Sequence, residues 1–261
     1  MQKDLKEEFI RHWDKHFPKA DLPIAFYYTD EDDGLPLQQA STEWRCLISN
    51  LIKVRQGTPL RFGPDSIGCA GGKRYCGFSH ALRKNFEYFL SCGIPGELEG
   101  ERYKKSPEIV REVMARWPKF KAPKKFIVFK RWDKLGDSDE PAVVIFFAAP
   151  DVLAGLYTLA GFDEVEDGVI APFGAGCASI VQNPYLERDS THPRCFLGMF
   201  DPSARPYVPA DTLTFAAPMN KFERMVRNME ESFLITETWG KMKKRIKSYT
   251  NFKGRNALRP R

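Results

Sequence analysis

The sequence predicts an α+β fold, or a mixed α/β fold, in which helices pack on a mixed, largely antiparallel sheet. Apolar residues at helical spacing indicate several amphipathic helices, and short runs rich in aromatic and β-branched residues indicate strands. The two kinds of segment follow one another without the strict alternation that a doubly wound sheet requires. With 261 residues, the chain can bury a sizeable core. We expect one globular domain over residues 1–250, with two interlocked lobes as the alternative.

Helical spacing and turn residues define the elements of the first half of the chain. Phe9, Trp13 and Phe17 recur at helical spacing and a proline follows them, which ends the first helix. A serine and a threonine can cap the next helix, which contains Cys46 and ends at a glycine. The predicted elements are a helix over 2–17, a strand over 22–29, a helix from 41 or 42 to 56, a loop over 66–78 and a helix over 79–92.

The second half of the chain contains the clearest strands. The run AVVIFFAA is apolar but far shorter than the ~20 residues of a membrane helix, so it indicates a buried strand. The pair Ser106-Pro107 is typical of a helix start. The predicted elements are a helix from 107 that ends before 118, strands over 124–132 and 142–149, a helix over 151–160, a glycine turn and short helix within 169–186, strands over 195–201 and 212–218, and helices over 220–233 and 236–249.

The net charge of +6 is concentrated at the C-terminal end. Residues 240–261 carry nine Lys or Arg and no acidic residue, which leaves −3 for the rest of the chain. We interpret residues 251–261 as a disordered basic tail rather than a nucleic-acid site, because the tail lacks the repeated aromatics of a base-stacking surface. The charged N-terminus is not typical of a secretion signal. We therefore expect a cytoplasmic protein without a membrane anchor; nothing in the sequence indicates its oligomeric state.

The six cysteines are the main candidates for chemistry. In the cytoplasm they should stay reduced unless they bind metal or take part in redox chemistry. No C-x-x-C motif occurs, and the six residues between Cys69 and Cys76 are too many for a zinc knuckle. We interpret Cys76 and Cys92 as structural residues.

Cys69 lies in the glycine-rich stretch SIGCAGGKRYCGF. Gly71 and Gly72 allow backbone N–H groups to turn toward a ligand, and Lys73 and Arg74 add positive charge. Such surroundings lower the pKa of a thiol, and they would equally hold a phosphate or carboxylate. A tight turn around a buried cysteine is the alternative.

Cys177 follows Gly174 and Gly176 at a predicted helix start, where free N–H groups favour a thiolate or an anion. Cys195 opens a strand. His12 and His16 are four residues apart on one helix, but the segment lacks the Glu of the H-E-x-x-H motif, so we interpret them as a surface pair.

Several of these segments together resemble the uncharacterised prokaryotic ArCR family (domain of unknown function 169). The resemblance rests on WRCLISNLIKVRQGTPLRFGPDSIGCAGGKRYCGF, GAGCASIVQNPYLE and PRCFLGMFDPSARPYVPADTLTFAAP, and it covers residues 22–250. It implies no activity. It does imply a set of functional positions, namely Cys46, Cys69, Gly71, Gly72, Cys177, Cys195 and Arg205.

Three functions remain open at this point. We favour a cofactor-binding protein in which Cys46, Cys69 and Cys177, with Cys195 as a fourth ligand, hold an iron–sulfur cluster or another soft metal, with a redox role. The second is a thiol-dependent enzyme whose Lys73, Arg74 and Arg205 hold an anionic small molecule. The third is a non-catalytic binding or interaction module.

Overall fold

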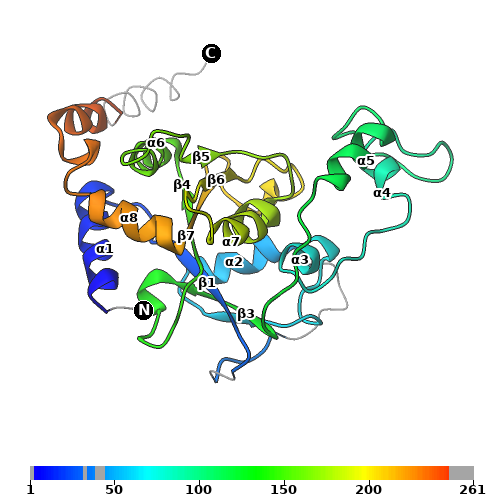
Figure 1. Ribbon diagram of the computed structural model, residues 1–261, viewed down its shortest axis with the longest axis horizontal. Helices are drawn as coiled ribbons and strands as arrows, with labels where there is room; N and C mark the ends of the chain where they lie inside the picture. Colours follow the sequence, from blue (N-terminus) through cyan, green and yellow to red (C-terminus); the bar gives the residue numbers. More distant parts are fainter. Residues whose placement is uncertain (1–2, 32–33, 39–44, 247–261) are drawn as a thin grey trace, which may run out of the picture.

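The computed structural model describes residues 3–31, 34–38 and 45–246 (Figure 1). The predicted tail, 251–261, lies outside the described residues. The elements in chain order are α1 (Lys3–His16), β1 (Ile24–Thr29), α2 (Leu47–Arg55), β2 (Leu60–Phe62), α3 (Ala70–Tyr75), α4 (Phe86–Phe89), α5 (Pro107–Ala115), β3 (Phe126–Arg131), β4 (Val143–Ala148), α6 (Pro150–Ala160), β5 (Val169–Ile170), a π-helical turn (Ala178–Gln182), α7 (Asn183–Glu187), β6 (Cys195–Gly198), β7 (Leu213–Pro218) and α8 (Met219–Asn228). A further helix follows over 237–246.

The strands form one sheet in the order β2-β3-β1-β4-β7-β6-β5. Every neighbouring pair is antiparallel except β5 and β6, which run parallel. Helices pack on this sheet without regular β-α-β alternation. The predicted α+β class with a largely antiparallel sheet is therefore confirmed.

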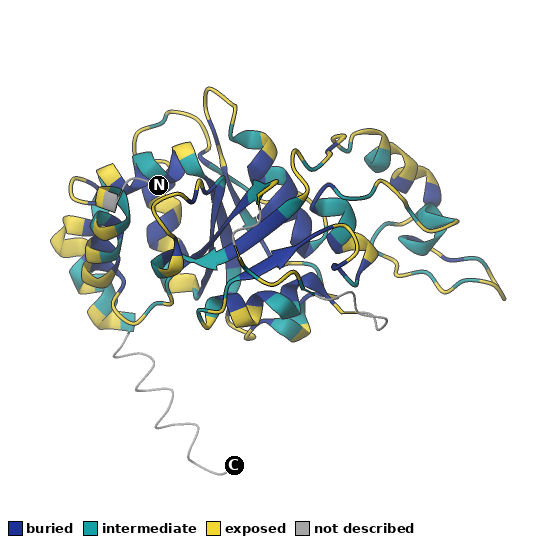
Figure 2. Ribbon diagram, turned by 90° about the horizontal axis from the view of Figure 1, so that it is seen from below, coloured by how far each residue is buried: buried dark blue, intermediate teal, exposed yellow. Residues whose placement is uncertain are grey.

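Side chains that alternate along each strand divide the core into two clusters, one on each face of the sheet. Along β4, Val143, Ile145 and Phe147 belong to one buried cluster, whereas Val144 and Phe146 belong to the other, as alternating side chains require. We call the first cluster the thiol face, since it contains Cys46, Cys69, Cys76 and Cys177 and is covered by α2, α3 and α7. The second, covered by α1, α6 and α8, is the aromatic face. Figure 2 shows the buried sheet between these helical layers.

Tilted and edge-on ring pairs dominate the aromatic face. Phe9 of α1 lies 5.4 Å from Trp132 and 5.0 Å from Phe222 between ring centroids, and Trp13 lies 5.1 Å from Phe146 of β4. These rings are at most 1% exposed. Aromatic pairs of this kind contribute about 0.5–1.5 kcal/mol beyond their area burial, so this face anchors α1 and α8 to the sheet.

Four local features differ from the predictions. The predicted helix over 79–92 is only the single turn α4, and the strand β2 at 60–62 was missed. Within the predicted loop 66–78 the chain forms α3. Cys46 precedes α2 as its N-terminal capping residue instead of lying inside the helix; residues 41–44 lie outside the described part. Short elements with few periodic positions give no reliable helical signal, which explains these errors.

The π-helical turn before α7 also has a local cause. Pro184 follows it inside a continuous helical segment, where a proline ring collides with the carbonyl four residues earlier. A wider turn relieves that collision. In the described part of the chain, no helix combines the length and the hydropathy needed to cross a bilayer.

Candidate functional site

Four cysteines from three separate segments gather on the thiol face. Cys46, Cys69, Cys76 and Cys177 are all buried in the same cluster. The side chains of Cys46 and Cys69 lie close enough to shift each other's pKa, and Cys177 contributes to the rise in the pKa of Cys46. Cys177 in turn interacts electrostatically with Cys69 and Cys76. The structure thus brings together the three cysteines that the sequence favoured, and it adds Cys76.

Three of these cysteines stand at the start of a helical segment. Cys46 precedes α2, Cys69 precedes α3, and Cys177 precedes the π-helical turn. The first turn of a helix carries N–H groups without intrahelical partners and the positive end of the helix dipole. The chain therefore supplies this cluster with backbone donors that favour negative sulfur.

The sulfur of Cys69 receives most of these donors. The Gly72 N–H, in the first turn of α3, donates to Cys69 Sγ over 3.3 Å. The backbone N–H groups of Leu47, at the start of α2, and of Cys69 itself also favour negative charge on this sulfur. With the Cys46 thiol as the strongest contributor, these hydrogen bonds lower the pKa of Cys69 to about 6 against the opposing effect of burial. These surroundings therefore favour the thiolate form of Cys69 over that of the other buried thiols.

Gly72 is required by this close approach. A Cβ at this position would lie 2.8 Å from Cys69 Sγ and 2.7 Å from Ile67 Cγ2, closer than packed atoms allow. Gly71 differs, because a Cβ there would meet nothing within 4 Å. Of the two glycines that the sequence singled out, Gly72 holds the thiolate geometry and Gly71 faces open space.

The other thiols of the cluster hold their protons. The Cys69 thiolate, to which Cys46 donates, raises the pKa of Cys46, and burial adds to that rise. Burial raises the pKa of Cys76 and Cys177, and the charge of Cys69 adds to both shifts. The site thus combines one thiolate with three neutral thiols.

Cys195 does not join the cluster. In β6, Phe196 lies on the thiol face opposite Ala216 of β7, so its neighbour Cys195 points to the aromatic face. There Cys195 Sγ lies 3.8 Å from the Met225 sulfur, and burial raises its pKa. The seven-stranded sheet separates this thiol from the other four.

The candidate anion-binding cations have other partners. Arg74 donates to the His80 carbonyl over 2.8 Å and lies over the Trp117 ring. Arg205 donates to the carbonyls of Met199, Thr212, Pro209 and Ala210. These hydrogen bonds hold the loop between β6 and β7 together. Lys73 is half-buried in the last turn of α3, so the donors to Cys69 come mainly from the backbone.

The glycines before Cys177 also have an internal partner. The Gly176 N–H donates to Asp201 Oδ2 over 3.2 Å, so a carboxylate of the chain takes the position that an external anion would use. A Cβ on Gly176 would lie 3.2 Å from Met199 Sδ, whereas Gly174 is exposed. Asp201 is a residue that sequence reasoning missed, because nothing in the sequence marks it as a neighbour of Cys177.

The sulfurs are not spaced for a single small ion. Among the residues that the structure describes, no three cysteine sulfurs lie within 4.8 Å of one another. Tetrahedral zinc with bonds of about 2.3 Å would bring sulfurs to roughly 3.8 Å. A polynuclear cluster holds each thiolate at a different metal atom and spaces them more widely.

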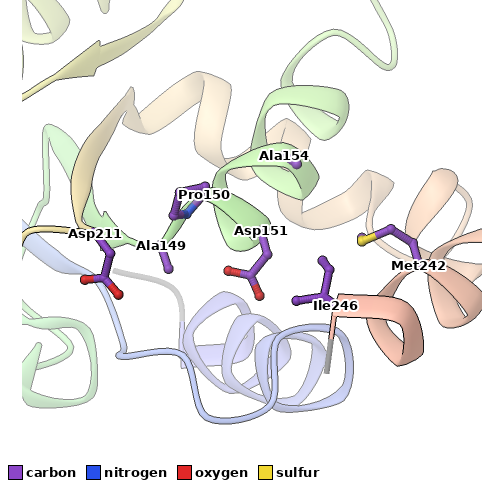
Figure 3. Close-up of a pocket in the computed structure, with 7 residues that line it drawn as sticks. All are labelled: Ala149, Pro150, Asp151, Ala154, Asp211, Met242 and Ile246. Atoms are coloured by element: carbon purple, nitrogen blue, oxygen red, sulfur yellow. The ribbon is translucent and has the colours of Figure 1, made fainter. Parts of the chain in front are cut away.

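A surface pocket of about 580 Å³ lies away from the thiols (Figure 3). Ala149, Pro150, Asp151 and Ala154 of the α6 region line it, with Asp211, Met242 and Ile246. It contains no cysteine and belongs to the opposite side of the sheet from the thiol site.

Comparison with known proteins identifies a matching family model, but no individual protein or solved structure that matches. The family model described as "Uncharacterised ArCR" (domain of unknown function 169) matches residues 20–228. Neither the search of curated proteins nor that of solved structures returned a match. The matched range includes all four cysteines of the thiol face.

Proposed function

The chain belongs to the uncharacterised ArCR family, a description that assigns no reaction, and we propose from the thiol site itself that this protein binds a soft metal centre. An iron–sulfur cluster is the favoured centre, held by Cys46, Cys69 and Cys177, with Cys76 as the available fourth thiol. The observation that carries this proposal is the convergence of buried thiols from segments far apart in the sequence on one thiolate.

The charge balance of the thiol site supports the binding of a metal. A buried thiolate is costly unless a positive group or several donors compensate it, and the donors to Cys69 are neutral backbone N–H groups and a neutral thiol. A metal cation would supply the missing positive charge, and its binding would release the protons that Cys46 and Cys177 hold. N–H donors to ligand sulfurs also tune the reduction potential of such centres.

The spacing and identity of the ligands favour a cluster over zinc. Thiolates are the usual ligands of iron–sulfur clusters, and among the described residues no three cysteine sulfurs lie as close together as a single zinc ion would require. Cys195 is left out of the ligand set, because it points to the aromatic face. Cys76 replaces it as the fourth thiol in this proposal.

Anaerobic purification tests the proposal. We expect a coloured protein with bound iron and acid-labile sulfide, and loss of both in Cys69→Ser and in Cys177→Ser. The matched controls are Cys195→Ser, which alters a buried thiol on the other face, and Cys92→Ser, which alters an exposed one; both should keep the metal. A colourless anaerobic preparation without iron or zinc would contradict the proposal.

A second candidate follows from Cys69 alone. A thiolate with a pKa of about 6 is a nucleophile at neutral pH, so the protein is alternatively a thiol-dependent enzyme. In metal-free protein, one cysteine should then be alkylated with a rate that rises through pH 6, and Cys69→Ser should abolish that fast phase. Alkylation of every thiol at the rate of a free peptide cysteine would exclude this candidate.

A further inference from the structure

His12 and His16 are buried, which makes their interpretation as a surface pair wrong. They lie four residues apart on α1, on one helix face, and their side chains are 8% and 4% exposed. The end of α8 packs against them: Glu230, in the turn after that helix, reaches both imidazoles. Figure 1 shows α1 and α8 side by side, on the opposite side of the sheet from α2 and α3.

Both imidazoles meet the same carboxylate oxygen. His12 Nδ1 lies 2.9 Å and His16 Nε2 lies 2.8 Å from Glu230 Oε1. Among the described residues, this is the one group of three His, Cys, Asp or Glu side chains whose ligand atoms all lie within 4.8 Å of one another. Two imidazole nitrogens and a carboxylate oxygen are a ligand set of zinc, which leaves its fourth position to water in such sites.

From this geometry we propose that His12, His16 and Glu230 bind one divalent cation of the zinc class. The cation replaces the hydrogen bonds between the imidazoles and Oε1, and water completes its coordination on the side where the Glu230 side chain is 39% exposed. The site is independent of the thiols, because the sheet lies between them.

The hydrogen bonds of this cluster set the tautomers of the two rings. Glu230 Oε1 accepts from His12 Nδ1 and from His16 Nε2, so each of these nitrogens carries a ring proton before metal binds. Binding of the cation moves that proton to the other ring nitrogen or releases it.

Neighbouring charges act on the site in both directions. Glu8 Oε1 lies 3.6 Å from His12 Nε2, where it can orient the ring as an outer carboxylate does in zinc sites; the exposed Arg11 lies at 3.5 Å from the same nitrogen. Lys15 bonds to the other oxygen of Glu230, which leaves Oε1 for the cation. Lys243 donates to the His16 carbonyl, and its charge, like that of Lys15, weakens cation binding.

Cobalt(II) distinguishes this site from the thiol site. In the full-length protein, Co²⁺ at His12, His16 and Glu230 should give weak visible bands without the strong near-ultraviolet band of thiolate ligation. We expect one such equivalent, lost in His16→Gln and weakened at least tenfold in Glu230→Gln. The matched control His80→Gln/His192→Gln changes the two exposed histidines and should keep the signal.

Stability provides the second measurement. Zinc at 100 times its Kd should raise the unfolding midpoint of the wild type by about 5 °C or more, and that of Cys46→Ser/Cys69→Ser/Cys177→Ser by the same amount. If a histidine variant fails to fold, Glu230→Gln takes its place in the test, because position 230 is exposed and glutamine retains hydrogen bonding. Absence of a thiolate-free cobalt signal from folded wild-type protein overturns the proposal, as does equal binding by Glu230→Gln.

Discussion

On the thiol face, Cys69 places its sulfur at the first turns of α2 and α3; on the aromatic face, Cys195 places its sulfur beside the Met225 thioether. Both cysteines are buried. The pKa of Cys69 falls to about 6, whereas burial raises that of Cys195. Burial alone therefore does not determine the pKa of a cysteine in this protein. The N–H and S–H groups around the sulfur determine whether that pKa falls or rises.

The two faces also differ in what fills their cores. On the aromatic face, Phe9, Trp13 and Phe222 surround Phe146, and Cys195 is the one cysteine among the described residues of this cluster. The thiol face gives part of its core to four cysteines, whose small side chains bury less apolar area than rings. The following experiments test this division, beginning with the largest expected effect.

Truncation of Phe146 should affect stability and spare the thiolate. Phe146→Ala removes a ring that is 1% exposed, and we expect a loss of about 3–5 kcal/mol in the free energy of unfolding. Denaturant unfolding measures that loss, and thiolate absorbance near pH 7 monitors Cys69 in the folded variant. Phe146→Leu serves if the alanine variant does not fold. A thiolate signal that disappears in a folded variant would show that the two faces are coupled.

The pair Gly72→Ala and Gly71→Ala tests the thiol face itself. The new Cβ at Gly72 would lie 2.7 Å from Ile67 and 2.8 Å from Cys69 Sγ, so we expect a loss of about 1–3 kcal/mol and a higher pKa for Cys69. Gly71→Ala meets no atom within 4 Å and should stay within about 1 kcal/mol of the wild type. Equal effects of the two changes would refute the role assigned to Gly72.

Removal of the Cys46 thiol should act on chemistry more than on stability. The Cys46 S–H is the strongest of the contacts that lower the pKa of Cys69, so Cys46→Ala should raise that pKa by roughly one unit, which corresponds to about 1.4 kcal/mol. Titration of thiolate absorbance in metal-free protein measures the shift. Cys92→Ala, at an exposed cysteine, is the control and should leave the titration unchanged.

The sequence was sufficient for the fold class because long periodic segments carry strong signals. The helices around Trp13 and Leu156 and the strand around Ile145 were each predicted at nearly their observed bounds. By contrast, β2 has only three residues and α3 has fewer than two helical turns, which is too short for a period to be recognised. Tertiary contacts, rather than local sequence, determine such elements.

The candidate site was predictable in composition and not in geometry. The sequence singles out Cys69 and Cys177 by their neighbours, whereas Cys46 and Cys195 enter through the family resemblance. It sets Cys76 aside, because the spacing from Cys69 does not match a zinc motif. Sequence alone does not reveal that Cys195 points away from the other thiols, since a shift by one residue reverses the face of a strand. Long-range neighbours such as Asp201 and Glu230 leave no local pattern.

The pH dependence of stability should have opposite signs for Cys69 and Cys195. A lowered folded-state pKa, as for Cys69, contributes stability that is present above the unfolded pKa of about 8.5 and is lost as the pH falls through about 6. A raised folded-state pKa, as for Cys195, contributes stability that is present below about 8.5 and is lost as the pH rises above that value.

The difference between two alanine variants isolates these contributions. Between pH 6 and 8.5 the free energy of unfolding of the metal-free wild type should rise relative to that of Cys69→Ala, by at most about 1.4 kcal/mol per pH unit. Relative to Cys195→Ala it should fall only above about pH 8.5. Denaturant unfolding over this range measures both slopes, since titrating groups that do not interact with the substituted cysteine cancel in each difference. If both differences had the same sign in the same pH range, the contrast between a donor-stabilised thiolate and a merely buried thiol would be wrong.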